Sequence, residues 1–126
     1  MQTETNSDVE TIREFINCWS TLDAPRLANY FTEDGIYYNM PAKPVAGRVA
    51  VEKFIAGFIA NWTETSWEIL NIAGEGHTVF CERLDKTKTQ NGDVDLPCLG
   101  VFEMRDGKIQ VWRDYFDMGT FMKAMS

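Results

Sequence analysis

The stretch VFCERLDKTK, residues 79–88, is typical of a β-strand that carries apolar and charged residues on one face. Side chains two positions apart point to the same side of a strand. The odd-numbered positions therefore share a face, which carries Val79, Cys81, Arg83, Asp85 and Thr87. The odd face carries apolar residues at one end and an ion pair at the other, and we expect helices to cover it.

The size and charge of the chain narrow its class. The chain has 126 residues, 44% of them hydrophobic and 25% charged, which is ordinary for one globular protein. We therefore expect residues 1–126 to form a single domain. The formal net charge is −7 at pH 7. Nucleic acid and anionic membranes are not expected partners, because both bind through clustered Lys and Arg.

The metal-binding and disulfide-forming residues are few. The three cysteines include no C-x-x-C pair, and His77 is the single histidine. We therefore expect no disulfide framework and no metal site, and a cytoplasmic location fits best. The polar, acidic N-terminus does not resemble a signal peptide, and no apolar run approaches membrane-spanning length.

Helical signals concentrate in the first half of the chain. Ser7 followed by Glu10 has the spacing of a capping box and predicts the start of a helix. Pro25 suits the first turn of a second, short helix. Apolar residues at helical spacing predict a third helix from about Val49 to Asn61.

Strand signals dominate the rest of the chain. The tripeptide EDG at 33–35 predicts a turn, and IYYNM at 36–40 a short strand; GTFMKAM at 119–125 predicts a last short helix. The predicted fold class is α+β: a strongly curved mixed or antiparallel sheet, covered by the N-terminal helices, that closes as a cone with an internal pocket. The long strands are expected at Thr65–Ile72, Thr78–Thr87, Val94–Met104 and Lys108–Asp117.

The last strand places an acid among aromatic residues. By alternation, Gln110, Trp112, Asp114 and Phe116 share one face. A carboxylate in such surroundings is costly to ionise unless it is paired. Arg83 is the obvious partner if the two strands face one cavity.

Two carboxylates around one cation form an asymmetric group. Arg83 can fully compensate only one of Asp85 and Asp114 in an apolar setting, so the other tends to keep its proton. One aspartate then starts as an acid and the other as a base. Tyr37 and Asn39, two apart on the first strand, can together hold a water molecule. An ion-pair network that only bridges two strands remains the alternative.

Four segments resemble the limonene-1,2-epoxide hydrolase family, in its order and over nearly the whole chain. They are YYNMPAKPVAGR at 37–48, ERLD at 82–85, LGVF at 99–102 and WRDYFD at 112–117. The resemblance implies a cone-shaped fold like that of nuclear transport factor 2 and ketosteroid isomerase, and a homodimer. It also implies cofactor-free, one-step hydrolysis of a small apolar epoxide, of cyclic or terpene type, to a vicinal diol.

The resemblance also implies a role for each residue. Asp114 is the base that takes a proton from water, and Tyr37 and Asn39 hold that water. Asp85 is the acid that protonates the epoxide oxygen. Arg83 lies between the two aspartates and orients both.

The expected pocket lining departs from the family in part. Cys98 and Thr87 are smaller or more polar than the large aliphatic residues usual there, which leaves the substrate open. An apolar outer face with Phe80, Leu84 and Val101 is a candidate dimer surface. The residues expected to contact substrate are Trp112, Phe116, Leu96, Cys98, Phe58, Trp62 and Thr87.

Two other functions fit the same fold class. One is a ketosteroid isomerase-like or polyketide cyclase-like enzyme, which typically uses one carboxylate base and an oxyanion donor. Arg83 argues against it, because a fixed cation holds the pKa of a base low. The other is a small-ligand binding module without catalysis, which does not require both Asp85 and Asp114.

Overall fold

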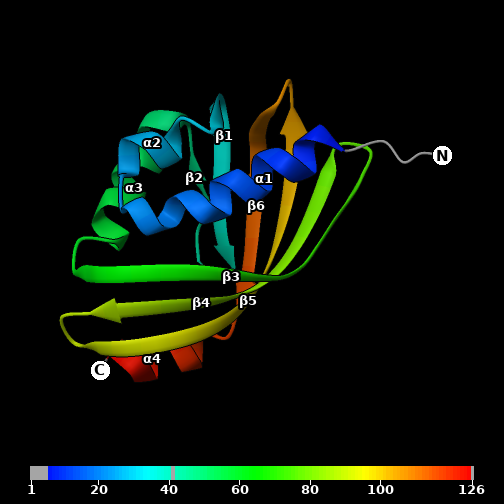
Figure 1. Cartoon of the computed structure of the whole chain (residues 1–126). Helices are drawn as coiled ribbons and strands as arrows, with labels where there is room; N and C mark the ends of the chain where they lie inside the picture. Colours follow the sequence, from blue (N-terminus) through cyan, green and yellow to red (C-terminus); the bar gives the residue numbers. More distant parts are fainter. Residues whose placement is uncertain (1–5, 41, 126) are drawn as a thin grey trace.

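The structure is a computed structural model that describes residues 6–40 and 42–125 (Figure 1). None of the helices in this part of the chain is long and apolar enough to cross a membrane. Helices α1, α2 and α3 lie on one side of a curved sheet, and α4 follows the last strand. The helical elements are α1 Ser7–Cys18, the 3₁₀-helix η1 Trp19–Thr21, α2 Ala24–Ala28, α3 Arg48–Phe58 and α4 Met118–Met125.

One six-stranded sheet forms the other layer, in the order β2-β1-β6-β5-β4-β3. Strands β1 and β6 run parallel, and the other neighbouring pairs run antiparallel. The long strands β3, β4 and β5 curve strongly (Figure 1). The α+β class and the mixed, curved sheet are therefore confirmed. The strands are β1 Phe31–Met40, β2 Val45–Ala46, β3 Trp62–Glu75, β4 Thr78–Thr89, β5 Gly92–Arg105 and β6 Lys108–Phe116.

The core lies between the helices and the concave side of the sheet. Ile12, Phe15 and Ile16 of α1 recur at helical spacing, and all three are fully buried. On β4, every odd-numbered position from 79 to 87 is buried, while the even-numbered ones are exposed or half-buried. The covered face of β4 is thus the one that the sequence predicts.

The N-terminus of α1 differs from the prediction. Asn6 is the N-cap, and its Oδ1 accepts hydrogen bonds from the backbone N–H groups of Asp8 (2.9 Å) and Val9 (3.3 Å). The capping box predicted from Ser7 and Glu10 is therefore wrong, because the helix begins one residue earlier than that box requires.

The turn predicted at residues 33–35 is also wrong, because β1 runs through it. A register shift against β6 between Phe31 and Ile36 makes this part of the strand irregular. Gly35 suits the irregularity, since a Cβ there would lie 3.0 Å from the carbonyl oxygen of Ile109. Helix α3 ends at Phe58, three residues before the predicted Asn61.

A second register shift, between β5 and β6, changes which residues of β6 face inward. Ile109 is fully buried, three positions before the fully buried Trp112. Gln110 instead lies near the surface, where its Nε2 is 3.5 Å from Oδ1 of Asp34. The prediction that Gln110 shares the inward face is wrong, because the extra residue shifts the alternation.

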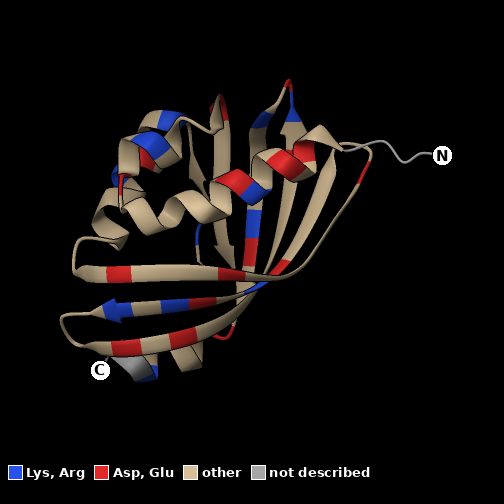
Figure 2. Ribbon diagram, viewed as in Figure 1, with Lys and Arg blue, Asp and Glu red and all other residues tan. Residues whose placement is uncertain are grey.

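Basic and acidic residues are mixed across the elements that Figure 2 draws. On β4, Lys86 pairs with Glu68 of β3 (3.3 Å), and it lies opposite Asp95 of β5.

Candidate active site

A buried arginine joins two buried aspartates at the centre of the curved sheet. Arg83 is fully buried, and Asp85 and Asp114 are 5% and 4% exposed. Arg83 donates to Asp85 from Nε (2.8 Å to Oδ1) and Nη2 (3.1 Å to Oδ2). It donates to Asp114 from Nη1 (2.8 Å to Oδ1) and Nη2 (2.6 Å to Oδ2). One guanidinium therefore holds both carboxylates in forked pairs.

The sheet register explains how Arg83 on β4 reaches Asp114 on β6. Strand β5 lies between β4 and β6. Its Gly100 is opposite Asp114 of β6 on one side and Cys81 of β4 on the other. A Cβ at Gly100 would lie 3.0 Å from Nη1 of Arg83 and 3.0 Å from Nε1 of Trp112. A glycine inside a strand commonly marks such a close approach. Gly100 thus opens the path along which the guanidinium crosses β5.

Aromatic rings support the guanidinium from the core side. Its carbon lies 4.4 Å from the ring centroid of Trp67 and 5.6 Å from that of Trp112. Burial alone would lower the pKa of Arg83, but the carboxylates of Asp114 and Asp85 outweigh burial and raise it. Arg83 is therefore a permanent cation in this site.

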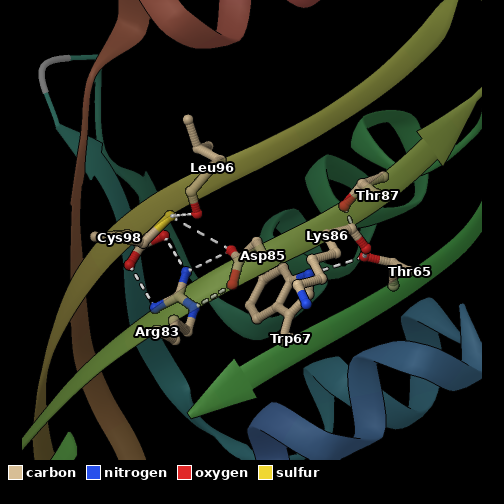
Figure 3. Close-up of polar contacts among 9 residues, drawn as sticks. Thr65, Trp67, Arg83, Asp85, Lys86, Thr87, Leu96 and Cys98 are labelled. Carbon is tan, nitrogen blue, oxygen red and sulfur yellow. Dashed lines mark hydrogen bonds and ion pairs between the residues drawn. The ribbon is translucent and has the colours of Figure 1, made fainter. Parts of the chain in front are cut away.

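Asp85 holds its proton more readily than an ordinary aspartate. Burial raises the pKa of Asp85 to about 6; Arg83 opposes this shift and Asp114 adds to it. The thiol of Cys98 is 3.4 Å from Oδ2 of Asp85 and donates to it. Figure 3 shows the Asp85 carboxyl bonded to both Arg83 and Cys98. A carboxyl with this pKa can donate a proton near neutral pH.

Tyr37 and Asn39 come from β1, which pairs in parallel with β6. The register places Tyr37 beside Trp112 and Asn39 beside Asp114. The Tyr37 ring stacks on Trp112, with centroids 4.2 Å apart and planes 2° apart. Burial raises the pKa of Tyr37 well above its usual value, and Asp114 adds to this effect. The phenol therefore stays protonated and can donate a hydrogen bond.

An internal cavity opens in front of the two aspartates, with walls from β1, β3, β4, β5, β6, α3 and α4. Its free volume is about 20 Å³, which is room for about one water molecule. The wall is mostly apolar apart from the acid–arginine site and its neighbours. The lining residues are Tyr37, Asn39, Phe58, Trp62, Trp67, Asp85, Thr87, Val94, Leu96, Cys98, Asp114, Phe116 and Phe121.

The structure brings together most residues predicted to contact substrate. Trp112 is the exception, because it is fully buried beneath Tyr37 and lies behind the cavity wall. Its place on the inward face is as predicted, but the Tyr37 ring separates it from the cavity. The predicted residues that do line the cavity are Phe58, Trp62, Thr87, Leu96, Cys98 and Phe116.

The sequence analysis does not identify Val94 or Phe121 as cavity residues, nor the role of Gly100. Val94 lies two positions before Leu96 on the same strand face, so strict alternation is enough to find it. Phe121 lies on α4, and the sequence predicts that helix but not where it packs. Gly100 carries the usual signal of a mid-strand glycine.

A cone-shaped α+β fold with a buried cation shared by two carboxylates at an internal cavity defines a class of small proteins with an enclosed, charged site. Within that class, the family model described as limonene-1,2-epoxide hydrolase catalytic domain matches residues 6–126. The chain belongs to this family.

Individual relatives agree with the family. Epoxide hydrolase EphG of Mycobacterium tuberculosis is 38% identical over 58 residues, and the match spans 46% of this chain but 39% of that protein. A solved structure of a limonene epoxide hydrolase-like epoxide hydrolase from M. tuberculosis has a TM-score of 0.83 at 25% identity. It covers 98% of this chain and 92% of that one.

A more distant neighbour shows the fold alone. It is a nuclear transport factor 2-like protein of unknown function from Burkholderia pseudomallei, with a TM-score of 0.87 at 15% identity. The superposition covers 97% of this chain and 99% of that one. The predicted cone fold is therefore confirmed, while the reaction has to be argued from the site.

Proposed function

We propose that the protein is a cofactor-independent epoxide hydrolase that adds water to a cyclic or terpene-type epoxide in one step and forms a vicinal diol. The observation that carries this proposal is the fully buried Arg83 with forked hydrogen bonds to both Asp85 and Asp114. Membership of the family supports the same reaction. The cavity wall is mostly apolar, which suits a small apolar epoxide.

Asp114 is the base in this proposal. Two hydrogen bonds from Arg83, of 2.8 and 2.6 Å, hold its carboxylate in one orientation. Asn39 lies beside it in the strand register, and Tyr37 lines the same cavity. The phenol and carboxamide hold a water molecule, and Asp114 takes a proton from that water as it attacks.

Asp85 is the acid. Its pKa of about 6 leaves part of the population protonated near neutral pH. As the water oxygen bonds to a ring carbon, the carbon–oxygen bond of the epoxide breaks, and the proton of Asp85 goes to the departing oxygen. The proton of the water goes to Asp114. Each such transfer contributes about 10²–10⁴-fold to the rate.

Recovery of the starting state requires a proton to return from Asp114 to Asp85. Arg83 lies between them with Nη2 bonded to both carboxylates. Because a guanidinium cannot accept a proton, Arg83 stays a cation that orients both carboxylates, and solvent carries the proton back after the diol leaves.

Substrate entry requires movement of the cavity wall. A free volume of about 20 Å³ holds one water but no six-membered ring. Phe121 of α4 lines the cavity and contacts Phe58 of α3, with ring centroids 6.0 Å apart. We propose that these two rings separate when an epoxide enters.

The test is hydrolysis of cyclic and terpene epoxides in ¹⁸O-labelled water by the wild type, Asp114→Asn and Asp85→Asn. We expect diol with label from solvent within a single turnover, and loss of nearly all activity in both variants. Asp95→Asn is the matched control, because Asp95 is exposed on β5, and it should keep wild-type activity.

Other outcomes separate the alternatives. Enone isomerisation without diol formation indicates the isomerase-like or cyclase-like enzyme. Tight binding of apolar ligands that survives both substitutions, with no turnover of any epoxide, indicates the binding module. Label that enters the protein rather than the diol in a single turnover contradicts the one-step reaction.

We also propose that the outer face of the sheet binds a second copy of the chain. The predicted surface around Phe80, Leu84 and Val101 continues into a shallow groove of about 740 Å³. Phe80→Glu is expected to convert a dimer into a monomer in sedimentation velocity, and a wild-type monomer contradicts the proposal. The large exposed apolar residues of this groove are Leu70, Phe80, Leu99 and Tyr115.

A further inference from the structure

Three polar side chains beyond the acid–arginine site are linked by hydrogen bonds, and the last of them lies in the cavity wall. Nε1 of Trp67 donates to Oγ1 of Thr65 (3.0 Å), and Oγ1 of Thr65 is 2.7 Å from Oγ1 of Thr87. Thr65 and Thr87 are 3% and 4% exposed, and Thr87 lines the cavity. Figure 3 shows these side chains on β3 and β4, further along β4 than Asp85.

Counting the donors and acceptors in these hydrogen bonds shows that the Thr87 hydroxyl can form one more hydrogen bond. Thr65 accepts from Trp67, so its single proton goes either to the carbonyl oxygen of Lys86 (3.3 Å) or to Thr87. In the first case Thr87 donates to Thr65 and presents a lone pair to the cavity. In the second case its own proton has no further partner among the described residues. Either way, Thr87 can take one more hydrogen bond.

The position of Thr87 suits contact with a bound substrate. It follows Asp85 by two residues on the same face of β4, so the two side chains are about 6–7 Å apart. The facing residues on β5 are apolar: Val94 lies opposite Thr87, and Leu96 lies opposite Asp85. Thr87 is therefore a polar point in an apolar stretch of wall. A substituent on an epoxide held at Asp85 could reach Thr87 across this distance.

We propose that Thr87 is a specificity-determining contact that selects alicyclic epoxides bearing a hydroxyl group on the side of the ring away from the epoxide. This inference rests on the proposed epoxide hydrolase function. A hydroxyl both donates and accepts, so it fits either arrangement of protons in these hydrogen bonds. A hydrocarbon of the same shape leaves this remaining hydrogen-bonding position of Thr87 unused, so we expect the hydroxyl-bearing substrate to be preferred.

A purely structural role for the same contacts makes a different prediction. Thr65 and Thr87 lie directly opposite each other on β3 and β4, and such pairs stabilise a sheet. If they only join the strands, removal of the Thr87 hydroxyl alters all substrates equally. A contact with substrate instead alters the preference between two substrates.

The experiment compares 4-hydroxymethyl-1,2-epoxycyclohexane with 4-ethyl-1,2-epoxycyclohexane, which differ by a hydroxyl in place of a methyl group. We expect wild type to prefer the alcohol in kcat/KM, and Thr87→Val to lower this preference at least tenfold. Thr87→Ser should restore most of it. Thr63→Val is the matched control, because the Thr63 hydroxyl is exposed and bonds the carbonyl of Lys88; it should leave the preference unchanged.

An unchanged preference in Thr87→Val overturns the inference, even if both rates fall. Binding of cyclohexylmethanol and ethylcyclohexane, the unreactive counterparts, is measured in parallel. We expect Thr87→Val to raise the Kd of the alcohol about tenfold and to leave that of the hydrocarbon unchanged. If no epoxide in the panel is hydrolysed, the proposed function fails, and this Kd comparison alone supports or overturns the role of Thr87.

Discussion

Two apolar clusters lie on either side of the acid–arginine site, and they differ in how tightly they are built. The larger one, between the helices and the sheet, contains fully buried rings such as Phe15, Trp19 and Trp112. The smaller one contains 5–8% exposed residues of β5, packed against half-buried rings. Its members are Val94, Leu96, Cys98, Phe116 and Phe121.

The larger cluster fixes the guanidinium. Trp19 stacks on Trp67 with centroids 4.1 Å and planes 13° apart, and Trp67 lies under Arg83. Phe15 contacts Trp112 edge-on at 5.2 Å. The smaller cluster borders the cavity and receives α4. The difference indicates that the site is held rigidly from behind and faces an adaptable wall, as substrate entry into a nearly closed cavity requires.

Truncation of one ring in each cluster tests this difference most strongly. Phe15→Ala should lower the free energy of unfolding by about 3–5 kcal/mol, because Phe15 is fully buried among other rings. Phe121→Ala should lower it by only about 1 kcal/mol, because that ring is half-buried. Urea denaturation of both variants measures the two losses.

The same pair of variants should differ in selectivity. Phe121→Ala enlarges the cavity, so kcat/KM for bicyclic epoxides should rise relative to that for cyclohexene oxide. Phe15→Ala should leave this ratio unchanged while the variant is folded. Similar losses of stability in the two variants, with no change in selectivity, would show that the two clusters do not differ in rigidity.

Asp85 lies between the two clusters, and its raised pKa should make the free energy of unfolding depend on pH. Asp85 has a pKa raised from its ordinary 3.8 to about 6. The folded state therefore binds the proton more tightly, and the free energy of unfolding falls as pH rises from about 4 to 6. The pKa difference corresponds to about 3 kcal/mol of the free energy of unfolding. This contribution is present below pH 4 and is lost above pH 6.

Asp85→Asn removes this titration and serves as the reference. Between pH 3.5 and 7, the wild type should lose up to about 3 kcal/mol relative to the variant, as measured by urea denaturation at each pH. Parallel curves for the two proteins would mean that Asp85 ionises in the folded state as easily as in the unfolded chain.

Close packing behind the guanidinium makes Gly100 the next point to test. A Cβ there would lie 2.9 Å from the Phe102 ring, 3.0 Å from Arg83 and 3.0 Å from Trp112. Gly100→Ala should displace the guanidinium and lower kcat about 10²-fold, the effect of misplacing catalytic groups by about 1 Å. Steady-state kinetics on cyclohexene oxide measure this loss.

Gly57→Ala is the matched control for this substitution. Gly57 lies in α3 with no heavy atom within 4 Å of a Cβ built there. Alanine at this position should raise the free energy of unfolding by about 0.4–1 kcal/mol and leave kcat unchanged. A wild-type kcat in Gly100→Ala would show that the guanidinium tolerates displacement and that the core side is less rigid than its packing indicates.

The sequence predicts the site better than it predicts the cavity. Alternation on β4 places Arg83 and Asp85 on the covered face, and the aromatic neighbours of Asp114 point to a partner for it. Those inferences use local periodicity and the cost of burying an unpaired carboxylate. Where a bulge adds a residue, alternation fails, as at Gln110. The position of Phe121 depends on how α4 packs against β5, and no local pattern encodes that contact.

Substitution of Cys98, which lies in the smaller cluster, should have the smallest effect on activity. Its Sγ lies 3.4 Å from Oδ2 of Asp85 and 3.5 Å from the carbonyl oxygen of Leu96, and its bond lowers the pKa of Asp85. In the proposed mechanism Asp85 must be protonated to act as the acid, so kcat/KM should fall above pH 6. Cys98→Val removes the donor, so this fall should move slightly to higher pH.

Cys98→Ser keeps a donor at the same place and separates hydrogen bonding from packing. The fall in kcat/KM should stay at or below the wild-type pH in this variant, because a hydroxyl donates more strongly than a thiol. A shift to higher pH in both variants would assign the effect to packing around Asp85. The adaptable wall would then influence the acid through its shape, and the two sides of the site would not be independent.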